Sequence, residues 1–368
     1  MTDGLPAPAY QIDPINGSPA QQDEAGVLSY RQLIWRRFRK NRMGMVAGAL
    51  LIVCYTIAVG APFVAPYHYN DVDVLVRHVP PQSLHLSIEH GFYVYGIQTI
   101  RNVETLEMEF AIDTKTIFPV SFLFMDNNGN RHLLGSEGPF FLLGTDRMGR
   151  DLLSRIIFGA RVSMSIGLVG VFLSLILGSL LGTVSGYFGG WMDHLIQRIV
   201  ELLASFPPIP LWMALGAAVP AGWTSIETYL GITIILSIVS WGGLAREIRG
   251  KVLVYREQEF ALAALAAGAS HWYIITRHLL PGCYSHIIVI ATLAIPGMIL
   301  GETALSFLGL GIRPPMTSWG VLLEEAQRVT VLLHYPWLLY PAVPVLLVVI
   351  AFNFLGDALR DAADPYAN

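Results

Sequence analysis

Charged residues are scarce in this sequence. Only 14% of the 368 residues are Asp, Glu, Lys or Arg, and 54% are hydrophobic, whereas a soluble domain carries about 25% charged residues. The formal net charge of −4 identifies no partner, because in membrane proteins the position of the charges matters more than their sum. The composition therefore predicts a protein embedded in a lipid bilayer, and we expect no nucleic-acid partner.

The residues that catalysis or metal binding would need are also missing or dispersed. The two cysteines, Cys54 and Cys283, lie in or beside apolar stretches, so a disulfide framework is not expected. No G-x-x-x-x-G-K-[ST] loop is present, because Arg249-Gly250-Lys251 lacks the preceding glycine at the required spacing. The ten histidines are scattered, and no Ser/His/Asp set or Cys/His ligand spacing occurs. We expect no catalytic residue, metal or bound cofactor in this chain.

Six segments are apolar enough to cross a bilayer, which takes roughly 20 residues. They run over Met45–Ala65, Val162–Val184, Leu195–Val219, Tyr229–Ala245, Ser285–Leu308 and Pro336–Phe354. The third contains Phe206-Pro207-Pro208-Ile209-Pro210, which predicts a kink or a partly unwound helix. The sequence therefore predicts an all-α polytopic membrane protein with six transmembrane helices.

The positions of lysine and arginine predict the orientation, because these residues concentrate in cytoplasmic loops. The approach to the first span is basic through Arg31, Arg36, Arg37, Arg39, Lys40 and Arg42. This places both termini, and the connection between the fourth and fifth spans, in the cytoplasm. One group conflicts, since four arginines precede the second span on the expected outer side: Arg147, Arg150, Arg155 and Arg161. They follow a long exported loop, where the rule loses force.

These predictions divide the chain into five parts. They are a partly disordered cytoplasmic arm (1–43), the first transmembrane helix (44–66), an extracytoplasmic insertion (67–143), a transmembrane domain (144–358) with a cytoplasmic loop at about 250–283, and a cytoplasmic tail (359–368). The insertion is too long to lack structure of its own. Its alternating segments 92–95, 106–110 and 120–124, with a turn signal at 126–130, predict a small β-rich lobe. The lobe is either a docking surface for a delivering partner or an insertion without a function.

The stretch FALAALAAGASHWYIITRHLLPG (260–282) lies in the predicted cytoplasmic loop. Gly268 costs about 1 kcal/mol relative to alanine inside a helix, so we expect the chain to turn there. Pro281 marks a helix stop or the first turn of the fifth span. The residues predict a short helix–turn–helix of small side chains, which a partner protein could approach closely. The alternative is an amphipathic helix resting on the lipid surface.

This stretch resembles the cytoplasmic loop motif of ABC-importer permeases: Glu-Ala-Ala, three residues, Gly, nine residues, Ile, any residue, Leu-Pro. Leu262-Ala263-Ala264, Gly268 and Leu280-Pro281 stand at the family spacing. Leu262 replaces the motif's glutamate and His278 its isoleucine. The position of Leu262 therefore offers no carboxylate to a partner, and Glu259, about one turn earlier, is the candidate substitute.

The resemblance extends from about Arg31 to Pro365, excluding the lobe. RRFRKNRMGM (36–45), LLGTDRMGRDLLSRIIFGARVSMSIG (142–167), SGYFGGWMD (185–193), ETALSFLGLGIRPPMTSWG (302–320) and AFNFLGDALRDAADP (351–365) are similar to the dipeptide/oligopeptide/nickel permease family, in its second-permease type. The resemblance implies the type I ABC-importer permease fold in a bacterial inner membrane. It also implies a second homologous permease, two cytoplasmic ATPases that use ATP, and an extracytoplasmic binding protein.

Two groups of residues become candidates on this basis. The residues expected to contact the ATPases are Glu259, Leu262, Ala263, Ala264, Gly268, Arg277 and Pro281. The residues considered for the substrate path or an extracytoplasmic gate are Asp146, Arg150, Asp151, Glu201 and Glu302. For the glutamates the alternatives are a polar path lining and a structural brace, and the brace is favoured because one glutamate cannot define a pocket. Asp146, Arg150 and Asp151 are expected to form a hydrogen-bonded scaffold.

The predicted function is that of the translocation subunit of an ATP-driven importer, with peptides as the favoured cargo. Oligosaccharides and nickel stay open, because selectivity in such systems lies largely in the binding protein. An ion-coupled secondary transporter is the alternative from another class, but it would show inverted repeats or paired intramembrane carboxylates, and none is evident. An intramembrane enzyme is disfavoured by the missing nucleophile and metal spacings.

Overall fold

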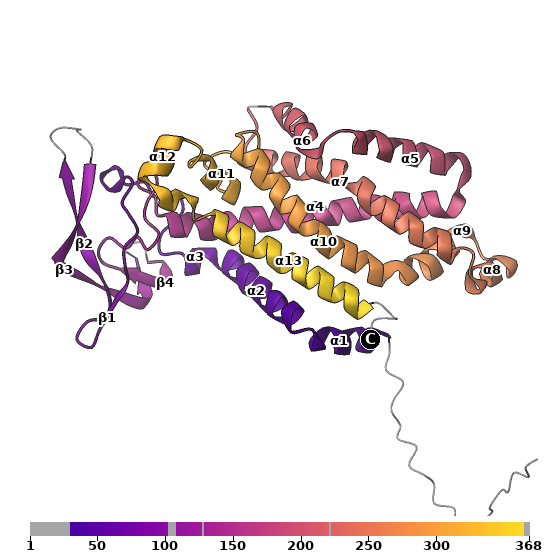
Figure 1. Cartoon of the computed structure of the whole chain (residues 1–368), viewed down its shortest axis with the longest axis horizontal. Coiled ribbons are helices and arrows are strands. Elements are labelled where there is room, and N and C mark those ends of the chain that lie inside the picture. The colour runs from indigo at the N-terminus through magenta and orange to yellow at the C-terminus, as the bar shows by residue number, and fades with distance from the viewer. Residues whose placement is uncertain (1–29, 102–107, 127–128, 221, 364–368) are drawn as a thin grey trace, which may run out of the picture.

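The computed structural model describes residues 30–101, 108–126, 129–220 and 222–363. A bundle of long helices makes up most of the molecule, with a small β-sheet at one end of the long axis and helices α8 and α9 at the other (Figure 1). The predicted N-terminal arm lies mostly outside the described residues.

Five helical segments are long and apolar enough to cross a membrane, and a bent pair supplies a sixth if it counts as one span. The five are α2 (Arg42–Val59), α4 (Leu152–Phe188), α7 (Ser225–Tyr255), the run His271–Phe307 that ends in α10 (Leu280–Phe307), and the run Pro336–Ala363 that includes α13 (Ala342–Ala363). The bent pair is α5 (Gly190–Ser205) and α6 (Pro208–Ala217), which meet at 90°. The break falls in the Phe206–Pro210 stretch and confirms the predicted interruption of the third span.

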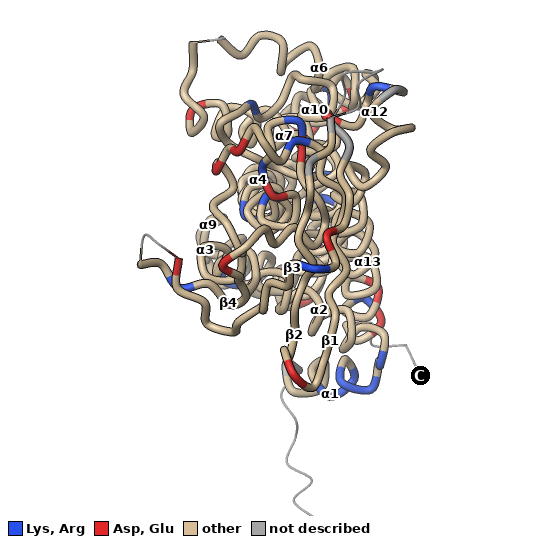
Figure 2. The backbone as a smooth tube through the Cα atoms, turned by 90° about the vertical axis from the view of Figure 1, so that its left-hand side faces the viewer, with Lys and Arg blue, Asp and Glu red and all other residues tan. Residues whose placement is uncertain are grey.

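Shorter helices lie before, between or at the ends of these spans. They are α1 (Tyr30–Lys40), α3 (Ala61–Val64), α8 (Glu259–Ala266), α9 (His271–Ile274), α11 (Trp319–Glu324) and α12 (Val329–His334), with single turns at Val74–Val76 and Pro336–Leu339. Helix α1 packs on the C-terminal end of α13, through Phe38 against Ala358 and Ala362. Seen from the end that carries the sheet, α1 is a strongly basic segment (Figure 2).

Helices α4 and α7 approach closely because α4 presents small residues to its neighbour. Ser174, Gly178 and Gly182 recur every four residues on one face of α4, and small residues at this spacing let membrane helices pack backbone to backbone. Ser174 Oγ donates to the Ser237 carbonyl of α7 at 3.0 Å, and Ser237 Oγ donates to the carbonyl of Gly170 at 3.0 Å. The second and fourth predicted spans therefore form one tightly joined pair.

We expect Gly182→Ala to separate this pair. An added Cβ at Gly182 would lie 2.4 Å from the carbonyl oxygen of Ala245, and overpacking of this kind costs about 1–3 kcal/mol. The matched control is Gly243→Ala on α7, where an added Cβ meets nothing within 4 Å and alanine is the better helix former by up to about 1 kcal/mol. Thermal unfolding of the detergent-solubilised protein should show a lower midpoint than wild type for Gly182→Ala and no decrease for Gly243→Ala. Equal midpoints for the two variants would contradict the close packing.

The insertion folds into a four-stranded antiparallel sheet in the order β1-β2-β3-β4. The strands are β1 (His85–Ser87), β2 (Gly91–Arg101), β3 (Met108–Met125) and β4 (Arg131–Ser136). The predicted β-rich lobe is thus confirmed. The strand-like segment 92–95 falls on β2, and residues 108–110 and 120–124 fall on the one long strand β3, which stays paired with β2 across a register shift at Tyr95/Gly96. Residues 106 and 107 lie outside the described part.

The lobe is built around a small core of its own and is tied to the helices. Val94, Val120 and Phe140 are buried together, and the turn after β3 is closed by the Asn130 amide, which donates to Asp126 Oδ1 at 2.7 Å. His132 of β4 contacts the carbonyl oxygen of Ala65, which follows α3, with its Nδ1 at 2.7 Å. The sheet is therefore attached to the end of the first span.

Candidate functional site

The segment between α7 and α10 forms a protrusion at the end of the molecule farthest from the sheet (Figure 1); we call residues 259–274 the α8–α9 protrusion. Helix α8 ends at Ala266, and Gly268 then takes a left-handed φ of 81°, which favours glycine. Ser270 caps α9 by accepting a hydrogen bond from the Tyr273 amide at 3.3 Å. The sequence thus forms the predicted helix–turn–helix, with the turn at Gly268.

The protrusion is rigidly joined to the membrane helices. Helix α9 runs through a π-helical turn (Ile275–Leu279) into α10, so that His271–Phe307 forms one 37-residue helical segment. Its inner side packs Ala261 and Ile274 against α7, and Leu279 of the π-helical turn packs beside them. The hydroxyl of Tyr187, on the last turn of α4, lies 2.8 Å from His271 Nδ1. A displacement of the protrusion would therefore move α10 directly and pull on α7 and α4.

The outer side of the protrusion is apolar. Five large side chains of α8 and α9 are between 42% and 56% exposed: Phe260, Leu262, Leu265, Trp272 and Tyr273. Exposed apolar groups gathered in one place mark interaction sites. Because three of these five side chains lie on α8, which belongs to none of the spanning segments, this surface suits contact with a protein.

The structure places all seven predicted coupling residues on the protrusion or its stem. Glu259, Leu262 and Ala263 are exposed on α8, and Ala264 is half-buried against the packed inner side. Gly268 forms the turn, Arg277 is exposed in the π-helical turn, and Pro281 stands in the first turn of α10. Phe260, Leu265, Trp272 and Tyr273 were missed. Their signal was large apolar side chains in a segment outside the predicted spans.

A buried cluster of four charges lies at the end of the bundle nearer the sheet. Arg150 Nε contacts Asp146 Oδ2 at 2.7 Å, and Arg150 Nη2 contacts Glu325 Oε1 at 3.2 Å. Arg155 Nη1 contacts the same two acids, with 2.9 Å to Glu325. The four side chains are at most 9% exposed. The cluster joins the segment before α4, the first turn of α4 and the end of α11.

Asp151 stands beside this cluster but has a different role. It is the N-cap of α4, and its Oδ2 accepts a hydrogen bond from the Ser154 amide at 2.7 Å. Burial raises the pKa of Asp151 to about 6, against the hydrogen bonds from Ser154, which lower it. The cap therefore holds a carboxyl group whose ionised form is destabilised by its surroundings.

This shift predicts a pH-dependent stability. Because the folded-state pKa of about 6 lies above the ordinary 3.8, the folded chain binds more protons than the unfolded chain between these values, and stability falls as pH rises through the interval. Asp151→Asn keeps a good helix cap and removes the titration. We expect the free energy of unfolding of the variant to exceed that of wild type by about 1–3 kcal/mol at pH 7. The two free energies should converge near pH 4. A difference that stays constant from pH 4 to pH 7 would contradict this.

The two candidate glutamates lie in unlike places. Glu302 of α10 is fully buried and accepts hydrogen bonds from Ser163 Oγ at 2.8 Å and Ser306 Oγ at 2.7 Å. Ser163 Oγ in turn accepts the Trp319 amide at 3.1 Å, so that α4, α10 and α11 meet here. Glu201 of α5 is exposed and paired with Arg198 at 2.9 Å. The structure does not bring the two glutamates together, and the contacts of Glu302 are those of a brace.

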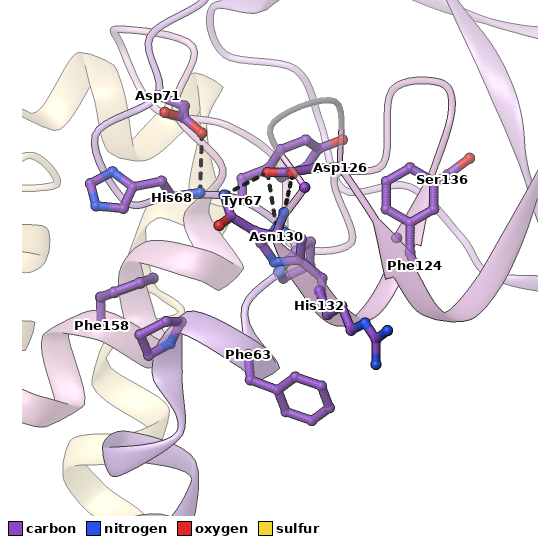
Figure 3. Close-up of a pocket in the computed structure, with 15 residues that line it drawn as sticks. Phe63, Tyr67, His68, Asp71, Phe124, Asp126, Asn130, His132, Ser136 and Phe158 are labelled. Carbon is purple, nitrogen blue, oxygen red and sulfur yellow. Dashed lines mark hydrogen bonds and ion pairs between the residues drawn. The ribbon is translucent and has the colours of Figure 1, made fainter.

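A pocket of about 850 Å³ opens where the lobe meets the helices (Figure 3). It lies between α3, the β3–β4 turn and the start of α4, and its wall includes Tyr67, Asp71, Asp126 and His132. Figure 3 shows Asp71 and Asp126 bonded to backbone and side-chain groups of their own loops. The wall is evenly polar and apolar, so the pocket has the character of a wet surface cleft.

The start of the insertion is also bonded to the segment that carries the buried charges. The Val79 amide donates to Thr145 Oγ1 at 2.8 Å, and the Thr145 amide donates to the carbonyl oxygen of Val79 at 2.9 Å. The ring of His78 stacks on Tyr335, with centroids 3.9 Å apart. The lobe is therefore connected through Thr145 to Asp146 and through Tyr335 to the segment that precedes α13.

Comparison with known proteins decides the family. Residues 156–367 match the family described as binding-protein-dependent transport system inner membrane components. The chain belongs to this family. Residues 29–81 of this permease also match the N-terminal transmembrane domain of oligopeptide transport permease C. The resemblance predicted from the sequence motifs is confirmed.

Relatives of the permease match over almost their whole length. It is 31% identical to the glutathione transport system permease protein GsiD of Pectobacterium atrosepticum, covering 94% of each chain. It is 32% identical to the dipeptide transport system permease protein DppC of Bacillus subtilis, covering 92% of this chain and 86% of the relative. With the Escherichia coli O157:H7 glutathione permease the identity is 34%, over 90% and 89%.

Membership fixes the general role of the permease. It is a multi-pass inner membrane component of a binding-protein-dependent ABC transporter, so it works with a binding protein and with ATPase subunits that use the ATP. It is not itself an enzyme. The alternative of an ion-coupled transporter acting alone is thereby excluded.

Proposed function

We propose that this permease is one of two homologous translocation subunits of a peptide importer that contains two cytoplasmic ATPases. Its relatives are named for glutathione and dipeptides, and glutathione is itself a small peptide. This favours peptides over the oligosaccharides or nickel that the sequence left open. The termini and the α8–α9 protrusion face the cytoplasm in this proposal, and the β-lobe faces outward.

The observation that carries the proposal is the form of the α8–α9 protrusion. Its exposed side chains offer an apolar contact of the kind that proteins use for binding, and its inner side is continuous with α10. We assign contact with an ATPase to the α8–α9 protrusion, with Leu262 and Ala263 in the interface and Glu259 and Arg277 at its polar rim. Nucleotide binding can shift the permease between inward-open and outward-open states only through contacts that differ between the states.

The lobe and the buried charges form the outer half of the proposal. We assign the lobe to docking of the binding protein, because it is bonded to the segment of Thr145 and Asp146 and does not hang free. Asp146, Arg150 and Asp151 then hold the start of α4 in place beneath the docked protein, as part of an outer gate. Glu302 braces three helices below it, and Glu201 has no role in the path.

Cross-linking tests the assignment of the two ends. In a background without Cys54 and Cys283, Leu262→Cys should form a disulfide-length cross-link with a coexpressed ATPase, whereas Leu86→Cys should not. Leu86 is a matched control, since it is exposed and apolar but lies on β1 at the opposite end. A cross-link from Leu86 and none from Leu262 would overturn the orientation.

Reconstitution tests the cargo. Vesicles that contain this permease, its paired permease and the ATPases should accumulate labelled peptide when the binding protein is supplied outside and ATP inside. The same vesicles, offered a labelled oligosaccharide or nickel with the same binding protein, should accumulate neither. Uptake of nickel or sugar without uptake of peptide would replace the proposed cargo and leave the ATPase assignment intact.

A further inference from the structure

A long apolar groove runs along the lipid-facing side of the first span. It has a volume of about 950 Å³ and is bounded by α1, α2, α4 and α13, through residues that include Trp35, Met45, Ile52, Val59 and Leu359. Its lining is almost entirely apolar. The groove follows the whole of α2, whose 18 residues make a helix about 27 Å long, close to the roughly 30 Å of bilayer hydrocarbon.

One end of this groove is basic. Trp35 and Met45 line that end, and Arg39 follows Trp35 by four residues while Arg42 precedes Met45 by three. Residues at these spacings share one helix face, so both arginines stand at the groove's mouth. Both are exposed, and no ion pair recorded among residues 30–101, 108–126, 129–220 and 222–363 involves either of them.

The acidic residues in the last two turns of α13 face elsewhere. On α13, Leu355 and Leu359 line the groove, whereas Asp357 and Asp361 are each two residues further along. A step of two residues turns an α-helix by about 200°, so both carboxylates point away from the groove. The mouth of the groove therefore carries positive charge that no acid of α13 offsets.

We propose that this groove binds an anionic phospholipid, with acyl chain against α2 and phosphodiester at Arg39 and Arg42. The occupant follows from the combination of an apolar channel of bilayer length and a cationic mouth. Clusters of basic residues beside a transmembrane helix attract anionic headgroups, and long apolar surfaces at the same place accept their chains. An amphipathic α1, held on α13 by Phe38, closes the groove at the headgroup level.

Native mass spectrometry of the complete transporter tests this site. The complex would be reconstituted in equal amounts of phosphatidylcholine and phosphatidylglycerol, extracted in mild detergent, and examined for retained lipid. Wild type should retain phosphatidylglycerol in preference to phosphatidylcholine. Arg39→Gln with Arg42→Gln should weaken that retention by roughly 30-fold, since each basic residue contributes about a fivefold factor near an anionic surface.

Two matched variants separate the groove from general surface charge. Arg36→Gln with Lys40→Gln removes the same charge from exposed positions of α1 that are turned by about 100–140° from the groove-lining Trp35, whereas Arg39 is turned by about 40°. This pair should keep retention within about twofold of wild type. Gly48→Leu keeps every charge but fills the groove, because Gly48 is part of the groove wall. The new side chain should be tolerated, since an added Cβ has Leu355 Cδ1 as its nearest neighbour at an ordinary 3.7 Å. This variant should lose the lipid as fully as the double arginine variant.

Three outcomes would overturn the proposal. They are equal retention by wild type and the Arg39/Arg42 variant, equal loss in the two charge-matched pairs, and unchanged retention in Gly48→Leu. A fourth outcome would replace the lipid with a different occupant. Ile52 lies in the groove, so a cross-link from Ile52→Cys to the paired permease would show that the occupant is a protein helix. None of these results depends on the cargo or on the ATPase contact.

Discussion

Gly268→Val should uncouple ATP hydrolysis from uptake. Gly268 has a φ of 81°, a conformation that a β-branched residue adopts only with strain. Strain of this kind costs about 1–3 kcal/mol, which lowers the population of a correctly turned α8–α9 protrusion by about 5- to 150-fold. An added Cβ meets no atom within 4 Å, so the effect arises from the backbone and not from a clash. Peptide uptake into vesicles should fall at least about fivefold, while basal ATP hydrolysis continues.

Gly268→Asn is the control for this prediction. Asparagine is among the few side chains that accept the left-handed region, so the turn should persist although the side chain is as large as valine's. We expect Gly268→Asn to retain most of the uptake, and both variants to reach the membrane in normal amounts. If valine and asparagine reduced uptake equally, the size of the side chain at an interface, and not the shape of the turn, would explain the loss.

The spans could be predicted because each is read from local composition. The Phe206–Pro210 interruption was predictable for the same reason, since proline acts on its own helix. The lengths were not: α4 begins at Leu152, ten residues before the predicted start, because its first turns are buried by α11, α12 and the insertion instead of by lipid. Hydropathy does not distinguish these two apolar environments.

The buried charges show what local reading cannot supply. Asp146 and Arg150 were expected to form a scaffold, but Arg155 and Glu325 were not assigned to it, since a contact between residues 170 positions apart leaves no trace in spacing. The same contact bears on the conflict with the predicted orientation. Two of the four conflicting arginines, Arg150 and Arg155, are neutralised by two buried acids, and so do not count as free positive charge in a loop.

Arg155→Met should be the most destabilising single change in the half of the permease nearer the sheet. Wild type balances two arginines against Asp146 and Glu325 in a site that is at most 9% exposed. Removal of Arg155 leaves one buried negative charge without compensation, and breaking a buried ion network from one side costs about 3–5 kcal/mol. The unfolding midpoint of the detergent-solubilised protein should fall far below that of wild type.

The same substitution on α5 provides the control. Among the described residues, Arg198 forms an ion pair with Glu201 alone, and both are exposed, so Arg198→Met should change stability by no more than about 1 kcal/mol. If Arg155→Met yields no folded protein, the double variant Arg155→Met with Glu325→Gln keeps the test informative. It restores the balance of one arginine and one aspartate, and should recover part of the lost stability, because a buried charge without a partner is more costly than an absent pair. Additive losses at Arg155 and Glu325 would show instead that the two residues act independently, and that the cluster does not tie α4 to α11.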